Sequence, residues 1–184
     1  MIVTVDDFNL GVTNIPDCED VELSTSEEVE AYISEWEPIL LKHLLGYDLA
    51  TNLALYADLA IPAPNPIYDN IIDGKVFGTG GDKDRYDGIK KAIIYFVFFK
   101  YLSHTQTKLT SSGEIVPKTE NSEQISSAHR LCIVYNLMTD SNIDLIAMLN
   151  ENLSLYPTWD EYSETQKGYD RISNLITKIN PYGI

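Results

Sequence analysis

The histidines and cysteines are the first residues to examine for chemistry, because they supply most metal ligands and many nucleophiles. His43, His104 and His129 lie far apart from one another in the sequence. Cys132 falls on an apolar helical face, where a thiol behaves as a small hydrophobic side chain, and no nucleophile motif surrounds it. Cys18 and Cys132 are too few for a disulfide scaffold or a four-cysteine zinc site. We therefore expect no metal, no cofactor and no catalytic residue among these side chains.

A glycine-rich acidic segment, Asp73–Gly88, is the second candidate for chemistry. It lacks the P-loop pattern, and Gly78-Thr79-Gly80 is not followed by the third glycine of a dinucleotide fingerprint. An EF-hand that started at Asp82 would place Tyr86 at a ligand position, so the calcium register fails. The sequence therefore predicts a surface loop, in which Asp84 or Asp87 caps the following helix.

Charge is the strongest signal in the composition. The net charge is −15, which disfavours binding to the phosphate backbone of nucleic acid as the main function. No Lys or Arg occurs before Lys42, whereas many carboxylates do: Asp6, Asp7, Asp17, Glu19, Asp20, Glu22, Glu27, Glu28, Glu30, Glu35 and Glu37. The simpler interpretation is a solvated acidic face, and the alternative is a surface that keeps a polyanion mobile. Under either interpretation these carboxylates should face solvent or a channel.

The length suits one domain, or one domain with terminal arms. The chain has 184 residues, of which 44% are hydrophobic. Met1–Asp20 lacks the pattern of a signal peptide, and the longest apolar run, Ala92–Phe99, is far short of a membrane span. We expect an intracellular protein that does not enter a membrane.

Helical spacing dominates the first half of the chain. Residues 1–23 indicate an N-terminal arm or an edge strand, and a helix then starts in a capping box at Ser24 or Thr25. Pro38 should interrupt this helix, which resumes at Ile39–Leu45 and ends at Gly46. Further helices are expected from Leu49 to Ala60, over Ile67–Ile72 and over the apolar stretch Ile89–Leu102.

The polar interval after this stretch predicts a β-hairpin. Thr107–Leu109 and Glu114–Val116 would be its strands, with Gly113 in the turn and Pro117 leaving the second strand at an edge. Ser122–Ser154 predicts one long helix, or two with a break near Thr139–Asn142. The expected fold is mainly α: a small helical bundle (24–156) with one protruding hairpin or extended loop inserted at 105–121, an N-terminal arm, and a C-terminal amphipathic helix and tail (157–184).

Several stretches follow one another in a recognisable order: Glu37-Pro38-Ile39-Leu40-Leu41, Leu45-Gly46-Tyr47-Asp48-Leu49, Tyr68 and Ile72-Asp73-Gly74, Tyr86-Asp87-Gly88-Ile89-Lys90, Lys100-Tyr101-Leu102, Thr110 and Gly113-Glu114-Ile115-Val116, Asn121-Ser122-Glu123, and Tyr135-Asn136. In order and spacing they resemble the helical head–tail connector (neck adaptor) proteins of tailed bacteriophages, in particular uncharacterised members from phages of Bacteroidetes-type hosts. The resemblance depends on element order and spaced hydrophobic residues, without an invariant chemical motif.

The resemblance implies a structural protein of the virion neck, made in the host cytoplasm and without catalysis or cofactor. Copies would form a ring of roughly a dozen subunits that binds the portal protein and the tail or stopper proteins. DNA would pass through the ring during genome ejection without specific binding. The implied intersubunit hairpin residues are Lys108, Leu109, Gly113, Ile115 and Val116, and the implied portal-docking tail contains Ile179, Pro181, Tyr182, Gly183 and Ile184.

Two other functions stay open at the level of sequence. One is a tail-completion or assembly factor that acts as a protein-interaction module. The other is an enzyme or regulatory domain that uses Cys132 or the Asp82–Asp87 segment.

Overall fold

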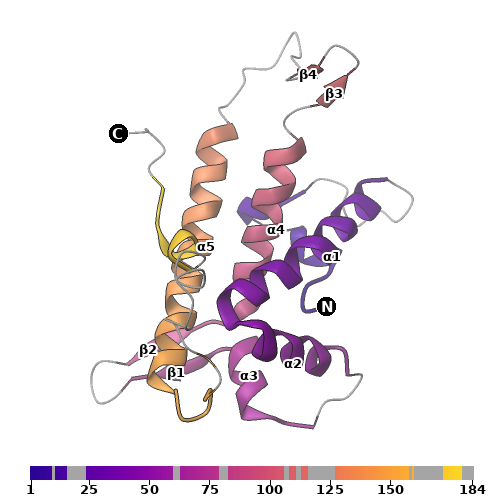
Figure 1. Cartoon of the computed structure of the whole chain (residues 1–184). Coiled ribbons are helices and arrows are strands. Elements are labelled where there is room, and N and C mark those ends of the chain that lie inside the picture. The colour runs from indigo at the N-terminus through magenta and orange to yellow at the C-terminus, as the bar shows by residue number, and fades with distance from the viewer. Residues whose placement is uncertain are drawn as a thin grey trace.

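Two long antiparallel helices, α4 (Ile89–Thr105) and α5 (Ser127–Glu151), form the centre of the molecule (Figure 1). The computed structural model describes residues 1–9, 11–15, 24–59, 63–78, 83–105, 108–110, 113–115, 127–157, 159 and 172–179. Helix α1 (Ser24–Leu45) crosses α4, and α2 (Tyr47–Ala57) and α3 (Pro66–Ile72) close one end of the bundle. The fold is mainly helical, a small bundle with hairpins and terminal segments, as the sequence predicts.

The predicted interruption at Pro38 is wrong, because α1 continues through this residue. A proline inside a helix leaves the carbonyl four residues earlier without its N–H partner. Here that residue is Ser34, and both Ser34 and Pro38 are exposed, so water can solvate the carbonyl. The helix ends where expected: Gly46 follows Leu45 with a φ of 77°, a conformation that favours glycine.

Helix α5 is a single helix without the break considered near Thr139–Asn142, and both of these residues are fully buried within it. Helix α4 starts at Ile89, as predicted, and extends to Thr105. Short helix α3 begins with Asn65 as its cap, whose side-chain oxygen accepts a hydrogen bond from the N–H of Ile67 at 3.1 Å.

The loop predicted for Asp73–Gly88 is instead a second hairpin, in which β1 (Lys75–Phe77) pairs antiparallel with β2 (Asp84–Tyr86). Two glycines at its base allow two backbone segments to approach closely. A Cβ atom on Gly74 would lie 2.2 Å from the carbonyl oxygen of Tyr86, and one on Gly88 would lie 2.2 Å from that of Ile72. Phe77 and Tyr86 are buried, so this hairpin belongs to the body of the fold.

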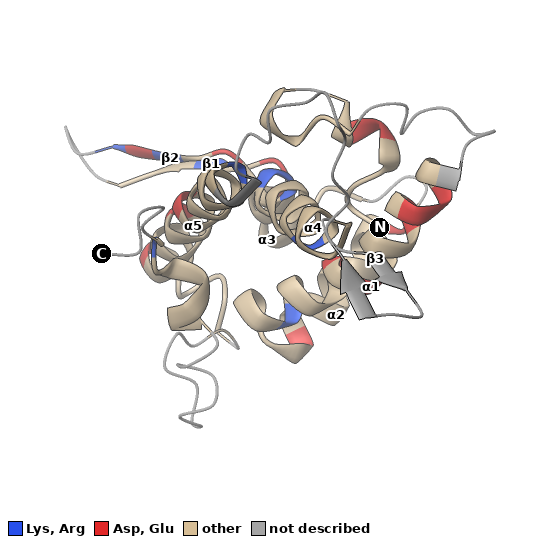
Figure 2. Cartoon of the chain, turned by 90° about the horizontal axis from the view of Figure 1, so that it is seen from above, with Lys and Arg blue, Asp and Glu red and all other residues tan. Residues whose placement is uncertain are grey.

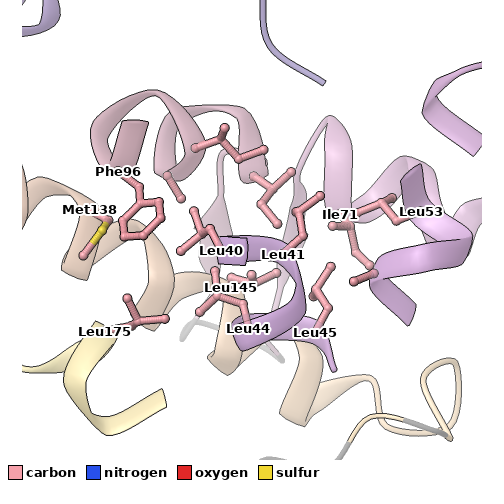
Figure 3. Packing of buried hydrophobic residues seen from close by; sticks show 14 of the residues in the cluster. Leu40, Leu41, Leu44, Leu45, Leu53, Ile71, Phe96, Met138, Leu145 and Leu175 are labelled. Carbon is pink, nitrogen blue, oxygen red and sulfur yellow. The ribbon is translucent and has the colours of Figure 1, made fainter. Parts of the chain in front are cut away.

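The core gathers side chains from every helix (Figure 3). Leu40, Leu41, Leu44 and Leu45 of α1 lie at its centre and are almost fully buried. Around them Figure 3 shows Leu53 of α2, Ile71 of α3, Phe96 of α4, Met138 and Leu145 of α5, and Leu175 near the C-terminus. Burying a large apolar side chain contributes about 1.5–3 kcal/mol to the free energy of folding, so this cluster is the main source of stability.

The N-terminal segment is part of this core and is neither a free arm nor an edge strand in its described residues. It forms two short 3-10 helices, η1 (Val5–Phe8) and η2 (Gly11–Thr13). Val3, Phe8 and Ile15 are buried against the bundle. The described N-terminal residues therefore pack on the bundle as short helical turns, where an arm or an edge strand was expected.

The described part of the C-terminal region contains one short helical segment, 172–176, where an amphipathic helix was expected. Ile172 and Leu175 are buried, and Trp159 donates from its indole nitrogen to the carbonyl oxygen of Leu44 at 2.9 Å. Within the described residues, no helix combines the length and apolarity needed to cross a membrane.

Candidate functional site

The predicted hairpin lies beyond the C-terminal end of α4 and the N-terminal end of α5, away from the core (Figure 1). Strand β3 (Lys108–Thr110) pairs antiparallel with β4 (Gly113–Ile115). Lys108 faces Ile115, Leu109 faces Glu114, and Thr110 faces Gly113 in the ladder. Gly113 therefore opens the second strand, where the sequence placed it in the turn. Val116 lies outside the described residues.

An aromatic cluster fixes the end of α4 from which this hairpin extends. Tyr101 packs edge-on against Tyr32 of α1, with ring centroids 5.4 Å apart, and Trp36 packs against Phe96 at 6.0 Å. His104 lies beside Tyr32 and Trp36, with centroids at 5.8 and 6.0 Å. These contacts join α1 to α4 near the C-terminal end of α4, and His104 itself is exposed.

Lys100 completes the aromatic cluster. Its ammonium lies 4.4 Å from the centroid of the Trp36 ring, a cation–π contact. Burial lowers the pKa of Lys100, and the nearby carboxylate of Glu35 opposes this shift. The root of the hairpin on the α4 side is therefore held by packing and by a partly desolvated cation.

Arg130 fixes the start of α5, on the other side of the hairpin root. Its guanidinium donates two hydrogen bonds to the carbonyl oxygen of Val12, at 3.1 and 2.8 Å, and one to that of Asn14 at 3.1 Å. The same group lies 4.8 Å from the centroid of the Phe98 ring in α4. One side chain thus joins the N-terminal segment, α4 and α5. This role of Arg130 was not predicted from the sequence, although an arginine near a helix start in so acidic a chain was a usable signal.

The C-terminal segment is hydrogen-bonded to α5 as far as Ile179. The side-chain amide of Asn136 donates to the carbonyl oxygen of Ile179 at 3.0 Å and accepts from its N–H at 2.9 Å. The thiol of Cys132 lies 3.2 Å from the same carbonyl oxygen. The side chain of Ile179 is 41% exposed. The remaining residues of the predicted portal-docking tail, Pro181, Tyr182, Gly183 and Ile184, lie outside the described residues.

One carboxylate contradicts the expectation that the acidic residues before Lys42 face solvent. Glu37 is only 4% exposed, and its two oxygens accept hydrogen bonds from the N–H groups of Ile2 at 2.9 Å and Val3 at 3.2 Å. Burial raises the pKa of Glu37, and the two backbone hydrogen bonds oppose that shift. The sequence spacing indicates this burial, because Glu37 stands four residues after Ile33 and therefore lies on the same buried face of α1.

The other described members of this acidic group are exposed or partly exposed. Asp6, Glu27, Glu28, Glu30 and Glu35 are exposed, and the acidic residues of α1 are drawn red in Figure 2. Asp7 forms an ion pair with Lys90 at 2.8 Å. Four members of the group lie outside the described residues: Asp17, Glu19, Asp20 and Glu22.

A cleft of about 320 Å³ lies between α1 and α2. Its lining is mostly apolar and includes Leu41, Ala50 and Ala54, and Tyr47 and Leu55 beside them are 67% and 64% exposed. Asp58 and Lys42 stand at the cleft. Apolar side chains this exposed around a hollow are typical of a surface that contacts another protein.

Three other side chains considered for chemistry are Asp87, His129 and Cys132, and they are ion-paired, exposed and buried, respectively. Asp87 pairs with Lys91 at 2.7 Å and with Arg85 at 2.8 Å, and Lys91 lowers the pKa of its carboxyl group. His129 stands three residues before Cys132 in α5, but His129 is exposed while Cys132 is buried against Ile179. Across the described ranges, no group of three or more potential ligand side chains could hold a metal ion. Asp82 lies outside these ranges.

Comparison with known families gives one match. A model described as a family of unknown function, DUF6712, matches residues 41–169, which is more than half of the chain. No curated protein and no solved structure matches the chain.

Proposed function

This chain belongs to the DUF6712 family, and we propose that it is a structural virion protein that forms a ring between portal and tail and continues the DNA channel. In this function it is a head–tail connector and performs no catalysis. The observation that carries the proposal is the β3–β4 hairpin at the outer end of the α4–α5 pair (Figure 1).

An isolated two-stranded hairpin is marginally stable in water, and both of its outer edges present unpaired backbone groups. Packing against an adjacent subunit would stabilise it and satisfy an edge. Because such a contact joins two different surfaces, it repeats from copy to copy and closes into a ring when the rotation permits.

The anchoring of the hairpin root supports the same function. The aromatic cluster of Tyr32, Trp36, Phe96, Tyr101 and His104 fixes the end of α4, and Arg130 fixes the start of α5. A projecting element binds a neighbour more tightly when its attachment to the body is already ordered, because ordering the element on binding would cost conformational entropy.

The charge distribution suits a channel for DNA. The net charge is −15, and the exposed carboxylates of α1 would repel a phosphate backbone. Without cations to neutralise phosphates there is no counterion release to hold DNA in place, so DNA could slide. Only neighbouring charges would repel one another strongly between subunits, because the screening length is about 8 Å at physiological ionic strength.

The cleft between α1 and α2 favours a second candidate, a tail-completion or assembly factor that acts as a protein-interaction module. The exposed Tyr47 and Leu55 beside this cleft offer an apolar contact that does not involve the hairpin. In that case assembly with a partner would survive removal of the hairpin.

Deletion of Thr107–Lys118 tests the proposal directly. The deleted chain should keep its helical circular dichroism and remain a monomer, because the hairpin lies away from the core, and it should lose ring formation by native mass spectrometry. Leu109→Asp in β3 should have the same effect. Val76→Asp, at the middle of β1 in the other hairpin, is the matched control and should leave the ring intact. A deleted chain that unfolds, or one that still forms the ring, would contradict the proposal.

A further inference from the structure

The cleft between α1 and α2 has the most exposed apolar side chains beside it. Helix α2 lies next to the C-terminal half of α1 (Figure 1), and the cleft between them has a volume of about 320 Å³. Among the large hydrophobic residues that the structure describes, Tyr47 and Leu55 at this cleft have the largest exposed fractions, 67% and 64%. Two such side chains beside an apolar hollow indicate a surface that a partner covers.

The polar groups of the cleft are hydrogen-bonded within the chain. Thr51 donates from its hydroxyl to the carbonyl oxygen of Tyr47 at 2.8 Å, and both carboxylate oxygens of Glu37 accept from backbone N–H groups. The two sides of the cleft are helices, whose interior backbone groups are paired within each helix. An extended peptide would find few backbone partners here, whereas a helix satisfies its own backbone groups. The cleft therefore favours a helical occupant.

Helix α2 lines the cleft along its whole length. The lining residues recur every three or four positions and so form one face of this helix: Tyr47, Ala50, Thr51, Ala54, Leu55 and Asp58. The 11 residues of α2 extend over ~16 Å at 1.5 Å per residue. The small side chains of Ala50 and Ala54 allow a second helix to approach closely at the middle of this face. A partner helix of about three turns would cover the face.

Carboxylates gather at the C-terminal end of α2. Asp58 lines the cleft and is exposed, and the amino group of Met1 pairs with it. Asp69 and Asp73 line a neighbouring hollow of about 310 Å³. The last carbonyl groups of α2 add a partial negative charge at this end. Because the described lining of the cleft contains one basic side chain, Lys42, positively charged residues of a partner would complement this end of the cleft.

We infer that the cleft between α1 and α2 binds an amphipathic helix of another protein. Its apolar side chains would enter the hollow, and its Lys or Arg residues would lie over the end of α2 near Asp58, Asp69 and Asp73. The net charge of −15 would also steer a positively charged partner toward the chain. The inference rests on the second function proposed above, for which it names the partner, and requires neither the hairpin nor a ring.

Two model peptides of about 14 residues, or four helical turns, test the inference with the full chain. One peptide contains Leu and Lys at helical spacing, and the other has Glu in place of each Lys. Each carries a fluorophore, and binding is measured by fluorescence anisotropy at physiological ionic strength. The Leu/Lys peptide should bind at least about tenfold more tightly than the Leu/Glu peptide, because only its charges complement the carboxylates beside the cleft.

Variants of the cleft separate apolar docking from attraction by charge alone. Leu55→Asp should weaken binding of the Leu/Lys peptide by about tenfold, because an apolar contact is lost. Attraction by charge alone would become stronger in this variant, which adds a carboxylate. Leu153→Asp makes the same change at an exposed leucine outside the cleft and should leave the dissociation constant unchanged. Tyr47→Ala adds no charge, should also weaken binding, and keeps the comparison possible if Leu55→Asp does not fold.

Equal affinity for the two peptides, equal binding by the unmodified protein and the folded cleft variants, or no binding of the Leu/Lys peptide would overturn the inference. If the Leu/Lys peptide does not bind and Leu55→Asp changes the oligomeric state in native mass spectrometry, the cleft contacts a second copy instead. A ring without peptide binding would support the connector function and overturn the inference. Specific peptide binding by a protein that never forms a ring would support the inference and contradict the connector function.

Discussion

At the scale of single residues, Glu37 and Arg130 connect the N-terminal segment to the helices. Glu37 binds the N–H groups of Ile2 and Val3, and Arg130 binds the carbonyl oxygens of Val12 and Asn14. Both partners are far away in the sequence, so local pattern alone could not pair them. The carboxylate is buried, whereas the guanidinium is exposed, and the two residues should respond differently to substitution.

Glu37 should make stability depend on pH. Burial raises its pKa in the folded state, with the nearby Asp58 adding to the shift and the amino group of Met1 opposing it. Between the ordinary pKa and the raised one, the folded state holds a proton that the unfolded state lacks. The free energy of unfolding should therefore fall as pH rises through this window, by at most ~1.4 kcal/mol per pH unit.

Urea unfolding over a series of pH values, for the unmodified protein and for Glu37→Gln, measures this effect. The amide of Gln does not titrate, so the decrease should become smaller in Glu37→Gln, even if the loss of one acceptor oxygen lowers its stability at every pH. The part due to Asp144, whose pKa burial also raises, should remain. Glu35→Gln, an exposed neighbour in α1, should keep the decrease. Parallel pH profiles for the unmodified protein and Glu37→Gln would show that this account of Glu37 is wrong.

Arg130→Ala should lower the free energy of unfolding by about 1–3 kcal/mol, because three hydrogen bonds from a charged donor are lost. Amide hydrogen exchange in residues 11–15 should accelerate at the same time. Lys178→Ala removes an exposed ion pair of α5 and is the matched control, with an expected cost of less than ~1 kcal/mol. Equal stability of Arg130→Ala and the unmodified protein would exclude the anchoring role.

At the scale of elements, the β1–β2 hairpin requires glycine at two positions where two backbone segments approach each other closely. Gly74 and Gly88 have φ values of 87° and 96°, and each meets the backbone of a distant segment. Tyr86 then donates from its hydroxyl to the carbonyl oxygen of Ile71 at 3.1 Å, which attaches β2 to α3. Buried Phe77 and Tyr86 make the hairpin part of the core.

Gly74→Ala and Gly88→Ala should each destabilise the protein more than Gly46→Ala. All three positions have a positive φ, which costs an alanine about 1–3 kcal/mol. Gly46 has open space around its Cβ position, whereas the other two would clash with carbonyl oxygens and add about 1–3 kcal/mol. Thermal or urea unfolding of the three variants gives the comparison. Equal decreases in the free energy of unfolding at all three positions would show that the close backbone approach at Gly74 and Gly88 does not affect stability.

Helices were predictable from sequence where apolar periodicity extends over several turns. Ile89 was predicted as the start of α4, and the long pattern after Ser122 predicted α5. The β1–β2 hairpin was missed because strands of three residues are too short to show alternation. The helix interruption predicted at Pro38 was wrong, because a helix can continue through a proline at an exposed position.

The candidate site was predictable only in part for the same reason. The β3–β4 hairpin follows from local turn residues, and its strands differ from the prediction by one position. The contacts of Arg130 and Asn136 join residues that are 118 and 43 positions apart in the sequence, and only the tertiary fold brings them together. The acidic character of Glu37 concealed its buried position, which the helical spacing from Ile33 already indicated.

At the scale of the whole molecule, the projecting β3–β4 hairpin and the apolar cleft between α1 and α2 are the surfaces on which the two proposed functions depend. The body of the fold is stabilised by one core, shown in Figure 3, to which helices α1 to α5 all contribute. The net charge of −15 makes the surface poorly suited to binding the phosphate backbone of nucleic acid.

Native mass spectrometry over a wide range of protein concentrations, with and without the portal protein, tests the central claim most directly. The connector proposal predicts a closed ring of many copies, formed either by the protein alone or on the portal. It also predicts that the variant lacking Thr107–Lys118 stays monomeric under the same conditions. A protein that remains a monomer at every concentration and does not bind the portal would contradict the proposal.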